Sequence, residues 1–311
     1  MSLLAVGSVA FDDLETPFGR RERILGGSAS YFSLSASHFR PVDIVAVVGQ
    51  DFGAEHFKVF EGRPIGLEGL VQVPGQSFHW KGIYCQDLSE AQTLETHLNV
   101  FAGFQPILPA RSREASFLFL GNIDPVLQLE VVRQMTRRPQ WIALDTMNFW
   151  IEGSKDALLA VLKEVDILLV NESEARSLSG ERNLVKAYQK IRAFGPRILV
   201  VKRGEHGVSL FTPEGYFMAP AFPLEEVHDP TGAGDTFAGG FLGHLANLKA
   251  LDLQSMKQAV ITGTVMASFT VEAFGTTRLE ALTAAHIQER IDLFSNMLQV
   301  PGNESKFQRR A

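Results

Sequence analysis

Short runs of apolar, often β-branched residues recur along the chain, and stretches with helical spacing separate them. The apolar runs are residues 3–9, 42–48, 117–120, 141–144, 167–170 and 198–201. The helical patterns include residues 125–136, 155–163, 184–194 and, near the end, 235–298. Strands that are buried on both faces are apolar throughout. The alternation therefore predicts an α/β fold with a mostly parallel central sheet flanked by helices.

Two stretches, residues 12–23 and 70–104, depart from this alternation because they are strand-like but polar at alternate positions. In the second stretch, residues 94–101 could pair with residues 78–84 as a hairpin, with residues 87–92 in the turn. A hairpin with polar outer positions that stays outside the parallel sheet predicts a small β lid. An ordinary surface hairpin is the alternative.

Composition and charge are those of a globular enzyme. Of 311 residues, 45% are hydrophobic and 21% are charged. The net charge of −6, from 29 basic and 35 acidic residues, argues against nucleic acid or an anionic membrane as the partner. The single cysteine, Cys85, excludes an intramolecular disulfide and favours a cytoplasmic location. No apolar run reaches the roughly 18 residues of a membrane span. We expect one domain over residues 1–300 and a flexible polar tail over residues 301–311.

The most informative segment is DPTGAGDTFAGGF, residues 229–241. Gly232 and Gly234 allow backbone conformations that a Cβ would forbid, so the N–H groups of residues 232–235 can point into one concavity. This concavity lies at the start of a helical pattern, where unpaired N–H groups and the helix dipole favour an anion. A plain helix N-terminus that is capped by Asp or Thr is the alternative.

This segment resembles the C-terminal signature of the ribokinase family, also called pfkB-type carbohydrate kinases. The resemblance implies a ribokinase-like fold with a β lid over the acceptor site, and transfer of the γ-phosphoryl group of ATP to a hydroxyl group. It implies that Asp235 is the catalytic base. It also implies that the backbone N–H groups of Gly232, Ala233, Gly234 and Asp235 form an anion hole for the phosphoryl group.

Acceptor-binding residues follow from the same resemblance. The N-terminal segment GSVAFD, residues 7–12, matches the opening strand of the family, whose acceptor-binding carboxylate maps onto Asp12. A turn residue is the alternative for this Asp. The segment GGSAS resembles the first family signature, where the backbone approaches the sugar, and it assigns Gly26, Gly27 and Ser30 to the acceptor.

A further family motif matches VGQDFG, residues 48–53. The match assigns Gly49 and Asp51 to the wall of the acceptor pocket, and a purely structural role is the alternative for both. These matches run in the order of the family, from Gly7 to Gly275.

The nucleotide half is implied by two strand ends. Asn171 and Glu174 match the Asn-x-x-Glu motif of the family, which organises Mg²⁺ and phosphate oxygens largely through water. A helix capping box formed by the same two residues is the alternative. Residues Lys202, Gly204 and Gly207 match the family turn that lies beside ATP. For Lys202 a solvated turn charge is the alternative.

The resemblance also covers the residues around the anion hole. Thr231, Gly232 and Gly234 are implied to contact the phosphates of ATP. Asp229 and Thr231 match the first half of a monovalent-cation site that many members carry, and K⁺ is therefore a candidate cofactor beside ATP and Mg²⁺. The second half of that site, around Gly275, fits loosely because backbone carbonyl groups would do the binding.

The acceptor itself stays open at this point. Sugar kinases and adenosine-type nucleoside kinases share every motif above, and we favour a sugar, with a nucleoside as the first alternative. A third candidate, a phosphorylated sugar, would need cations such as Arg20, Arg21, Arg23 and Lys81 in its pocket. Aromatic lid residues could stack on a base, form a core of the lid, or pair two lids in a homodimer; they are Phe78, Trp80, Tyr84, Phe101 and Phe104.

Proteins of other classes are the remaining alternatives. A sugar- or nucleotide-binding regulator of the same fold that has lost catalysis would share these motifs. A dehydrogenase would carry a Gly-x-Gly-x-x-Gly segment after its first strand, and this sequence has none there. A P-loop kinase is disfavoured because the sequence has no Gly-x-x-x-x-Gly-Lys-Ser/Thr segment.

Overall fold

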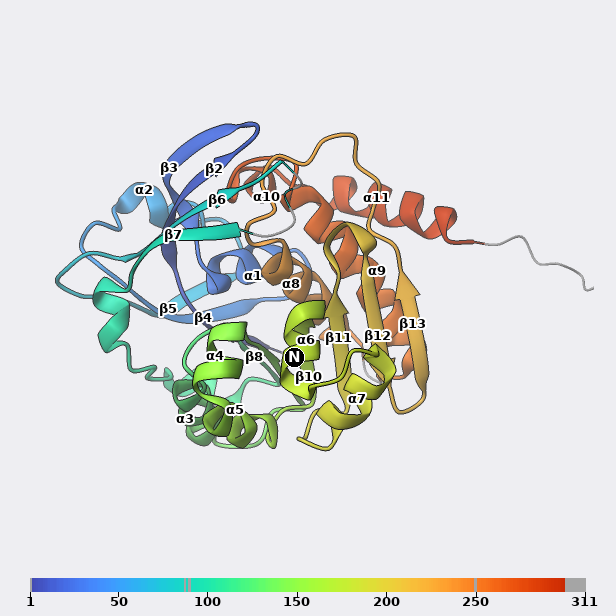
Figure 1. The fold of residues 1–311 in the computed structure, drawn as a ribbon. Helices are drawn as coiled ribbons and strands as arrows, with labels where there is room; N and C mark the ends of the chain where they lie inside the picture. Colours follow the sequence, from blue (N-terminus) through green and yellow to red (C-terminus); the bar gives the residue numbers. More distant parts are fainter. Residues whose placement is uncertain (1, 87, 89–90, 249–250, 300–311) are drawn as a thin grey trace, which may run out of the picture.

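A nine-stranded sheet forms the centre of the computed structural model, which describes residues 2–86, 88, 91–248 and 251–299 (Figure 1). Its strands are β1 (Leu3–Val6), β4 (Val42–Val48), β5 (Ile65–Gln72), β8 (Phe117–Leu120), β9 (Trp141–Asp145), β10 (Ile167–Asn171), β11 (Ile198–Lys202), β12 (Val208–Thr212) and β13 (Gly215–Ala219). They lie in the order β13-β12-β11-β10-β9-β8-β1-β4-β5. All pairs are parallel except β11 with β12 and β12 with β13. The predicted α/β fold with a mostly parallel sheet is confirmed.

Helices cover both faces of this sheet. One layer consists of α3 (Pro125–Gln134), α4 (Asn148–Gly153), α5 (Lys155–Leu162), α6 (Glu172–Ser179) and α7 (Leu184–Arg192). The other consists of α1 (Ser28–Ala36), α8 (Ala233–Leu245) and α9 (Leu253–Thr270), with α11 (Ala284–Met297) packed on α9. Shorter helices are α2 (Ala54–Phe57), α10 (Thr277–Glu280) and the 3₁₀ helices η1 (Asn99–Gly103), η2 (Ala110–Glu114) and η3 (Gly204–His206). No helix within the described ranges is long and apolar enough to cross a membrane.

Successive side chains of each buried strand serve opposite layers. In β1, Leu4 and Val6 pack with the α3–α7 layer, whereas Leu3 and Ala5 pack with α1, α8 and α9. On that second side, Phe32 of α1 stacks on Phe119 of β8 with ring centroids 4.0 Å apart. Both faces are therefore apolar, which explains why the strands appear in the sequence as continuous apolar runs.

A second sheet of four strands lies at the upper left of Figure 1 and corresponds to the predicted lid. Its strands are β2 (Ala10–Thr16), β3 (Gly19–Gly26), β6 (Phe78–Tyr84) and β7 (Ala91–His97), in the order β3-β2-β6-β7. β2 pairs with β6 in parallel, and the two outer pairs are antiparallel. The lid is thus assembled from two hairpins that are far apart in the sequence.

Some predicted boundaries are wrong, each for a local reason. The strand expected over residues 3–9 ends at Val6, because Ser8 then leaves the sheet and exchanges hydrogen bonds with Ser28 at the start of α1. The hairpin strand expected over residues 94–101 is β7, residues 91–97, and residues 99–103 form η1 instead. Residues 70–72 belong to β5 in the large sheet.

Helix ends differ less from the prediction: α3, α5 and α7 each end one or two residues before the predicted bound. The expected tail, residues 301–311, lies outside the described residues, as do residues 87, 89 and 90 of the expected turn.

The stack of Phe32 on Phe119 gives a test of the packing between α1 and the sheet. Phe119 is fully buried, so Phe119→Ala should lower the free energy of unfolding by about 3–5 kcal/mol, through lost transfer energy and the cavity that it leaves. The same change at Phe149, which is 64% exposed, is the control and should cost well under half as much. Urea titration of both variants measures the difference, and equal losses would contradict the packing described.

Candidate active site

Polar side chains gather at the edge of the large sheet where its central strands end. Asp145 ends β9, Asn171 ends β10 and Lys202 ends β11, and each of these strands is a parallel neighbour of the next. Asp12 lies shortly after β1, on β2. The carboxyl ends of parallel strands are where α/β sheets bind ligands. The start of α8 lies beside these strand ends, because Gly234 lies next to the Lys202 side chain.

The turn into α8 depends on Gly232. Its φ of 72° lies in the left-handed region, and a Cβ at this position would lie 2.3 Å from the ring of Tyr31. The turn places the N–H groups of Gly234 and Asp235 in the first turn of α8, where helical acceptors are lacking. The N–H of Ala233 donates to the carbonyl of Pro230 at 3.2 Å. Of the backbone donors predicted for an anion hole, the N–H groups of Gly234 and Asp235 thus lie in the first helical turn, whereas the Ala233 N–H is engaged within the turn.

Three carboxyl groups, those of Asp145, Glu174 and Asp235, act electrostatically on the ammonium group of Lys202. Asp145 is in direct contact with it, because its Oδ2 accepts a hydrogen bond from Lys202 Nζ at 2.6 Å. Burial, followed by the charge on Asp145, raises the pKa of Asp235 to about 7, and Lys202 opposes the shift. Burial and the Asp145 charge likewise raise the pKa of Glu174 to about 7. At neutral pH these two groups are thus poised between their charged and neutral forms.

Asn171 and Glu174 form a capping box at the start of α6. Asn171 Oδ1 accepts from the Glu174 N–H at 2.8 Å, and Glu174 Oε2 accepts from the Asn171 N–H at 2.7 Å. The capping alternative is therefore what the geometry contains. It fixes both side chains at the strand edge, and the amide and carboxylate oxygens match the hard ligands that Mg²⁺ prefers. Within the described ranges, no group of three or more His, Cys, Asp or Glu residues is arranged to hold a metal by itself.

Lys202 is not a solvated turn charge. Its side chain is 18% exposed, and a Cβ added at Gly234 would lie 2.9 Å from its Nζ. Arg203, the next residue, is paired with Glu172 instead, at 2.7 Å. The turn that follows β11 closes through a hydrogen bond of 2.8 Å from the Arg203 N–H to the carbonyl of Gly207. The two neighbouring cations therefore differ: Lys202 pairs with Asp145 at the strand ends, and Arg203 pairs with Glu172 of α6.

Gly204 and Gly207 frame that same turn, which contains η3. Their φ values of 53° and 83° are both positive. A Cβ at Gly207 would lie 2.1 Å from the carbonyl oxygen of Ala219, whereas nothing lies within 4 Å of one at Gly204. Gly207 is therefore required for close packing, and Gly204 for its backbone conformation alone.

Asp12 and the first glycine-rich segment lie against each other. Asp12 is 4% exposed, and burial, with the charges of Asp229, Asp235 and Asp13, raises its pKa to about 8. A Cβ at Gly26 would lie 1.9 Å from Asp12 Oδ2, so the glycine makes room for this carboxyl group. The structure thus brings together the Asp12 and Gly26 that the sequence placed in one pocket.

The next residues of that segment begin α1. Gly27, with φ 93°, is the N-cap of the helix, and Ser30 and Tyr31 follow in its first turn. Both side chains are buried. Among the described residues, neither the Ser30 Oγ nor the Tyr31 hydroxyl has a hydrogen-bond partner. Burial, and then the charge on Asp12, raises the pKa of Tyr31 well above its usual range.

Asp229 joins the two segments that were predicted as halves of a cation site. Its Oδ1 accepts from the Thr231 N–H and its Oδ2 from the Gly275 N–H, both at 2.9 Å. The Thr231 hydroxyl donates to the hydroxyl of Tyr84, at the end of β6, at 3.2 Å. The lid therefore contacts the segment immediately before the anion-hole turn.

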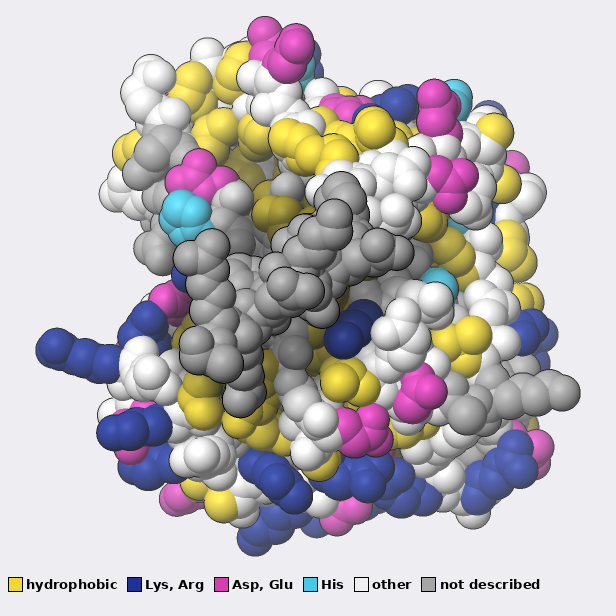
Figure 2. Space-filling view, turned by 90° about the vertical axis from the view of Figure 1, so that its right-hand side faces the viewer, with side chains coloured by type: hydrophobic (Ala, Val, Ile, Leu, Met, Phe, Trp, Pro, Cys, Tyr) yellow, Lys and Arg dark blue, Asp and Glu magenta, His cyan; other side chains and the backbone are white. Residues whose placement is uncertain are grey.

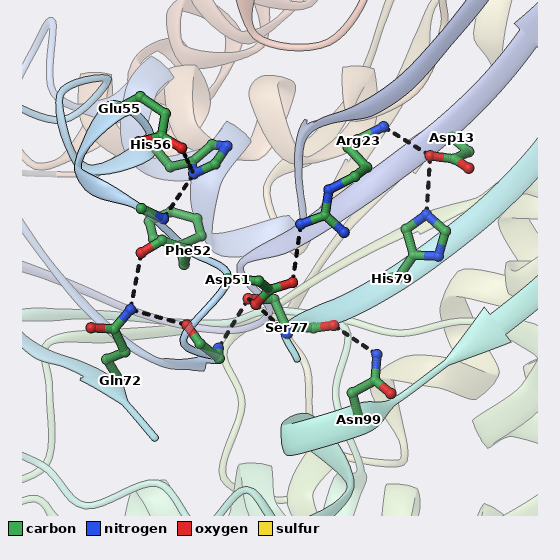
Figure 3. A network of polar contacts seen from close by, with 12 residues as sticks. Asp13, Arg23, Asp51, Phe52, Glu55, His56, Gln72, Ser77, His79 and Asn99 are labelled. Carbon is green, nitrogen blue, oxygen red and sulfur yellow. Dashed lines mark hydrogen bonds and ion pairs between the residues drawn. The ribbon is translucent and has the colours of Figure 1, made fainter. Parts of the chain in front are cut away.

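Figure 3 shows a polar network between the lid and the large sheet. Asp51 Oδ1 accepts from the backbone N–H and the hydroxyl of Ser77, at 2.7 and 2.8 Å, and its Oδ2 accepts from Arg23 at 3.1 Å. The N–H of Gly49 donates to the Ser77 hydroxyl at 2.9 Å. These contacts occupy both oxygens of Asp51, so they favour the structural role over a place in the acceptor pocket.

The four lid cations that a phosphorylated acceptor would require have partners already. Arg20 pairs with Glu22, Arg23 with Asp51 and Lys81 with Glu95, and Arg21 lies over the ring of Phe274 at 4.8 Å. On the face shown in Figure 2, Lys and Arg side chains gather along the lower edge, at the end away from the lid. The geometry therefore does not favour a phosphorylated sugar.

Asp145 and Tyr31 are residues of this region that the sequence reasoning missed. Asp145 had a usable signal, since it ends an apolar strand just as Asn171 does. Tyr31 had none, because a ring that packs under a turn is set by tertiary structure alone. Tyr84 was expected among the aromatic lid residues, but its hydrogen bond with Thr231 was not predicted.

Comparison with known proteins agrees with this geometry. Residues 9–282 match the family described as pfkB family carbohydrate kinase. The cytidine kinase of Thermococcus kodakarensis is 30% identical over 259 residues, which cover 81% of this chain and 91% of that protein. The nucleoside kinase of Methanothermobacter thermautotrophicus is 26% identical over 88% of this chain and 90% of its own length.

Solved structures agree on the fold. The Burkholderia thailandensis nucleoside kinase in complex with inosine superimposes with a TM-score of 0.77 at 18% identity, over 94% of this chain and 97% of that one. A ribokinase from Thermotoga maritima superimposes with a TM-score of 0.74 at 19% identity, over 94% and 99% of the two chains.

The raised pKa of Asp12 predicts a pH-dependent effect of Asp12→Asn. Between the usual pKa near 4 and the folded value of about 8, the folded protein holds a proton that the unfolded chain lacks, so the wild type loses stability as pH rises. Asn carries no charge, so the variant should gain up to about 1.4 kcal/mol relative to the wild type for each pH unit in this window.

Urea unfolding at about pH 5 and about pH 8 measures this gain. Asp292→Asn, at an exposed position on α11, is the control and should behave alike at both pH values. A gain for Asp12→Asn that does not grow with pH would contradict a buried, protonated Asp12.

Proposed function

This chain belongs to the pfkB family of carbohydrate kinases, and from that membership we propose that it phosphorylates the ribose of a nucleoside. The predicted activity, an ATP-dependent kinase that acts on a sugar hydroxyl, is confirmed by the family. The observation that carries the choice of acceptor is the 30% identity to a cytidine kinase across 81% of the chain. Cytidine is therefore the first acceptor to test.

The lid supports a nucleoside over a bare sugar. Phe101 stacks on both Phe78 and Phe104, with ring centroids 5.4 Å apart in each of these two pairs, and the three rings so form a small core. Trp80 lies outside this stack and pairs with Asp12 in the register of β2 and β6. A nucleoside whose ribose diol bonds to Asp12 would have its base within reach of the indole ring, a large flat surface for stacking.

In the proposed reaction, Asp235 removes the proton of the acceptor hydroxyl group while the oxygen of that hydroxyl group attacks the γ-phosphorus of ATP. The bond from that phosphorus to the bridging oxygen breaks, and ADP leaves. The N–H groups of Gly232, Gly234 and Asp235 would stabilise the charge on the transferred phosphoryl group, because donors at a helix N-terminus are fixed in place before the reaction. Asp12, Gly26, Gly27 and Ser30 hold the acceptor.

The residues for ATP lie at the strand ends on the other side of Asp235. In this proposal, the phosphates and the rest of the nucleotide lie against four residues: Thr231, Lys202, Gly204 and Gly207. Mg²⁺ bound through Asn171 and Glu174, largely by way of water, would neutralise phosphate charge. Asp229 and Thr231 are the proposed residues for K⁺, and the hydrogen bonds of Asp229 to Thr231 and Gly275 support a shared loop structure there.

We also propose that the protein forms a homodimer through its lid and that it is located in the cytoplasm. Leu94, on the outer lid strand β7, is 48% exposed, and Leu98, which follows this strand, is 46% exposed. β7 is an edge strand of the lid sheet, so its outer N–H and C=O groups, together with the exposed Leu94, are available to pair with a second copy. A free, exposed Cys85 is consistent with the reducing cytoplasm, where ATP is available.

The Asp235→Asn variant tests the catalytic base. With MgATP and cytidine, uridine, adenosine, inosine, ribose or ribose 1-phosphate, ADP release should be fastest for one nucleoside, and the variant should lose at least about a hundredfold in kcat. The KM for the nucleoside should change little, because Asn keeps the shape of the side chain. A variant that keeps more than about a tenth of the wild-type kcat would sink the assignment. A wild type that acts on ribose alone would overturn the choice of nucleoside.

The pH profile tests the same group. Asp235 acts as a base only when it is ionised, so kcat/KM should fall about tenfold per pH unit below about pH 7. Glu174→Gln should keep this acid limb, because burial and the charge of Asp145 still act on Asp235. Disappearance of the limb in Glu174→Gln would assign it to Glu174 instead.

A further inference from the structure

The end of β9 is held by hydrogen bonds from a buried side-chain amide. Gln128 of α3 is fully buried, and its side-chain amide donates to the carbonyl of Gly121 at 2.8 Å and to that of Asp145 at 3.1 Å. Gly121 directly follows β8, so this amide ties together the ends of β8 and β9. The backbone of Asp145 is thereby fixed at the edge of the sheet where Asp235 also lies.

The side chain of Asp145 holds Lys202 in place. Lys202 Nζ donates to Asp145 Oδ2 at 2.6 Å, and within the described part of the chain this is its only hydrogen-bond partner. An ammonium group has three donors, so two remain available to a ligand. The Asp145 and Lys202 side chains are 7% and 18% exposed, whereas the Arg138–Asp166 pair at the opposite end of β10 is 12% exposed at Asp166 and 50% at Arg138.

The position of the ammonium group links this pair to the anion-hole turn. A Cβ at Gly234 would lie 2.9 Å from Lys202 Nζ, so the ammonium group touches the turn whose N–H groups face the phosphoryl site. Burial lowers the pKa of Lys202, but the charges of Asp145, Glu174 and Asp235 outweigh it and keep the group protonated. A fixed positive charge therefore lies beside the proposed base.

We propose that Asp145 and Lys202 act as one unit in phosphoryl transfer, in which Asp145 positions the Lys202 ammonium group against Gly234 so that it binds the phosphoryl group being transferred. Lys202 is the residue that touches the substrate, and Asp145 is a positioning residue that acts through it. The inference rests on the proposed kinase site and deepens it, because Lys202 is assigned to the γ-phosphoryl group and not to the adenosine side of ATP. A preorganised cation at this point stabilises charge that develops in the transition state.

A purely structural ion pair is the rival explanation. Buried ion pairs are often replaceable by neutral side chains with little change in stability, whereas removal of one partner leaves an uncompensated charge. The rival therefore predicts that Asp145→Asn and Lys202→Met change stability and leave the kinetic constants of the folded protein unmoved.

The kinetic test compares Asp145→Asn, Lys202→Met and the double variant with MgATP and the best acceptor. Lys202→Met should lower kcat about a hundredfold or more, the usual cost of losing one transition-state donor, with the acceptor KM nearly unchanged. Asp145→Asn should cost about tenfold or more. Because Asp145 acts through Lys202, the double variant should fall within about threefold of Lys202→Met. Losses that multiply in the double variant would overturn the unit.

A binding test reads the same contact without turnover. Calorimetry should show that Lys202→Met binds ADP within about twofold of the wild type, and a non-hydrolysable ATP analogue about tenfold or more weakly. Equal weakening for both nucleotides would move Lys202 away from the γ-phosphoryl group and overturn the inference. Lys202→Arg should restore part of the analogue affinity, because it restores a cation at this position.

A matched control separates these effects from folding. Asp166→Asn removes a carboxylate that also forms an ion pair, with Arg138 at 3.0 Å. This pair lies at the opposite edge of the sheet. The substitution should lower the thermal unfolding temperature and leave kcat and analogue affinity unchanged. If the wild type binds the ATP analogue but phosphorylates no nucleoside, the acceptor proposal fails while the binding test still decides the role of Lys202. If Asp145→Asn keeps more than about half of the wild-type kcat and affinity, the positioning role fails.

Discussion

The burial of like charges beside a single cation is the constraint on which the site depends. Asp145, Glu174 and Asp235 act electrostatically on one another and on Lys202, at an edge where much of the water is excluded. Such an arrangement is costly unless charges are paired or protons are retained. Here both occur: Asp145 pairs with Lys202, and the other two carboxyl groups keep pKa values near neutrality. One cation and two carboxyl groups that titrate near neutrality therefore lie together at this edge, which is the electrostatic environment that the proposed binding of a phosphate and a divalent cation requires.

The packing around this edge serves the same arrangement. Gly232 takes a left-handed conformation with Tyr31 beneath it, and Gly234 leaves space for the Lys202 ammonium group. On the other side, Gly26 leaves space for Asp12. A methyl group at any of these positions would displace an aromatic ring, a cation or a carboxyl group of the site. The glycines are thus fixed by the side chains that they admit, as much as by the turns in which they lie.

The sequence was sufficient for a mostly parallel sheet and for six of its nine strands, because a strand buried on both faces has a continuous apolar run. It placed residues 70–72 of β5 in the lid and did not predict β12 and β13. It also indicated Asp12, Asn171 and Asp235, since each follows a run or opens a helix. The sequence did not predict the position of residues that are held by contacts between distant segments. The Tyr31 ring under Gly232, the Tyr84 contact to Thr231 and the burial of Lys202 depend on segments that are far apart in the chain. The limits of β7 were also missed, because a strand with nearly every residue exposed has no apolar pattern to mark its ends.

The parallel pairing of β2 with β6 has a consequence for how such an enzyme changes its acceptor. Because the lid is assembled from residues 10–26 and 78–97, it is not a contiguous module that one insertion or exchange could replace. Its first half runs directly into the glycine-rich segment at the start of α1. In its second half, β6 ends at Tyr84, whose hydroxyl accepts a hydrogen bond from Thr231 just before α8. A change of acceptor would therefore require coordinated substitutions in two distant stretches of the chain. We expect acceptor specificity to evolve gradually, with the effect of each substitution depending on the residues already present in the other stretch.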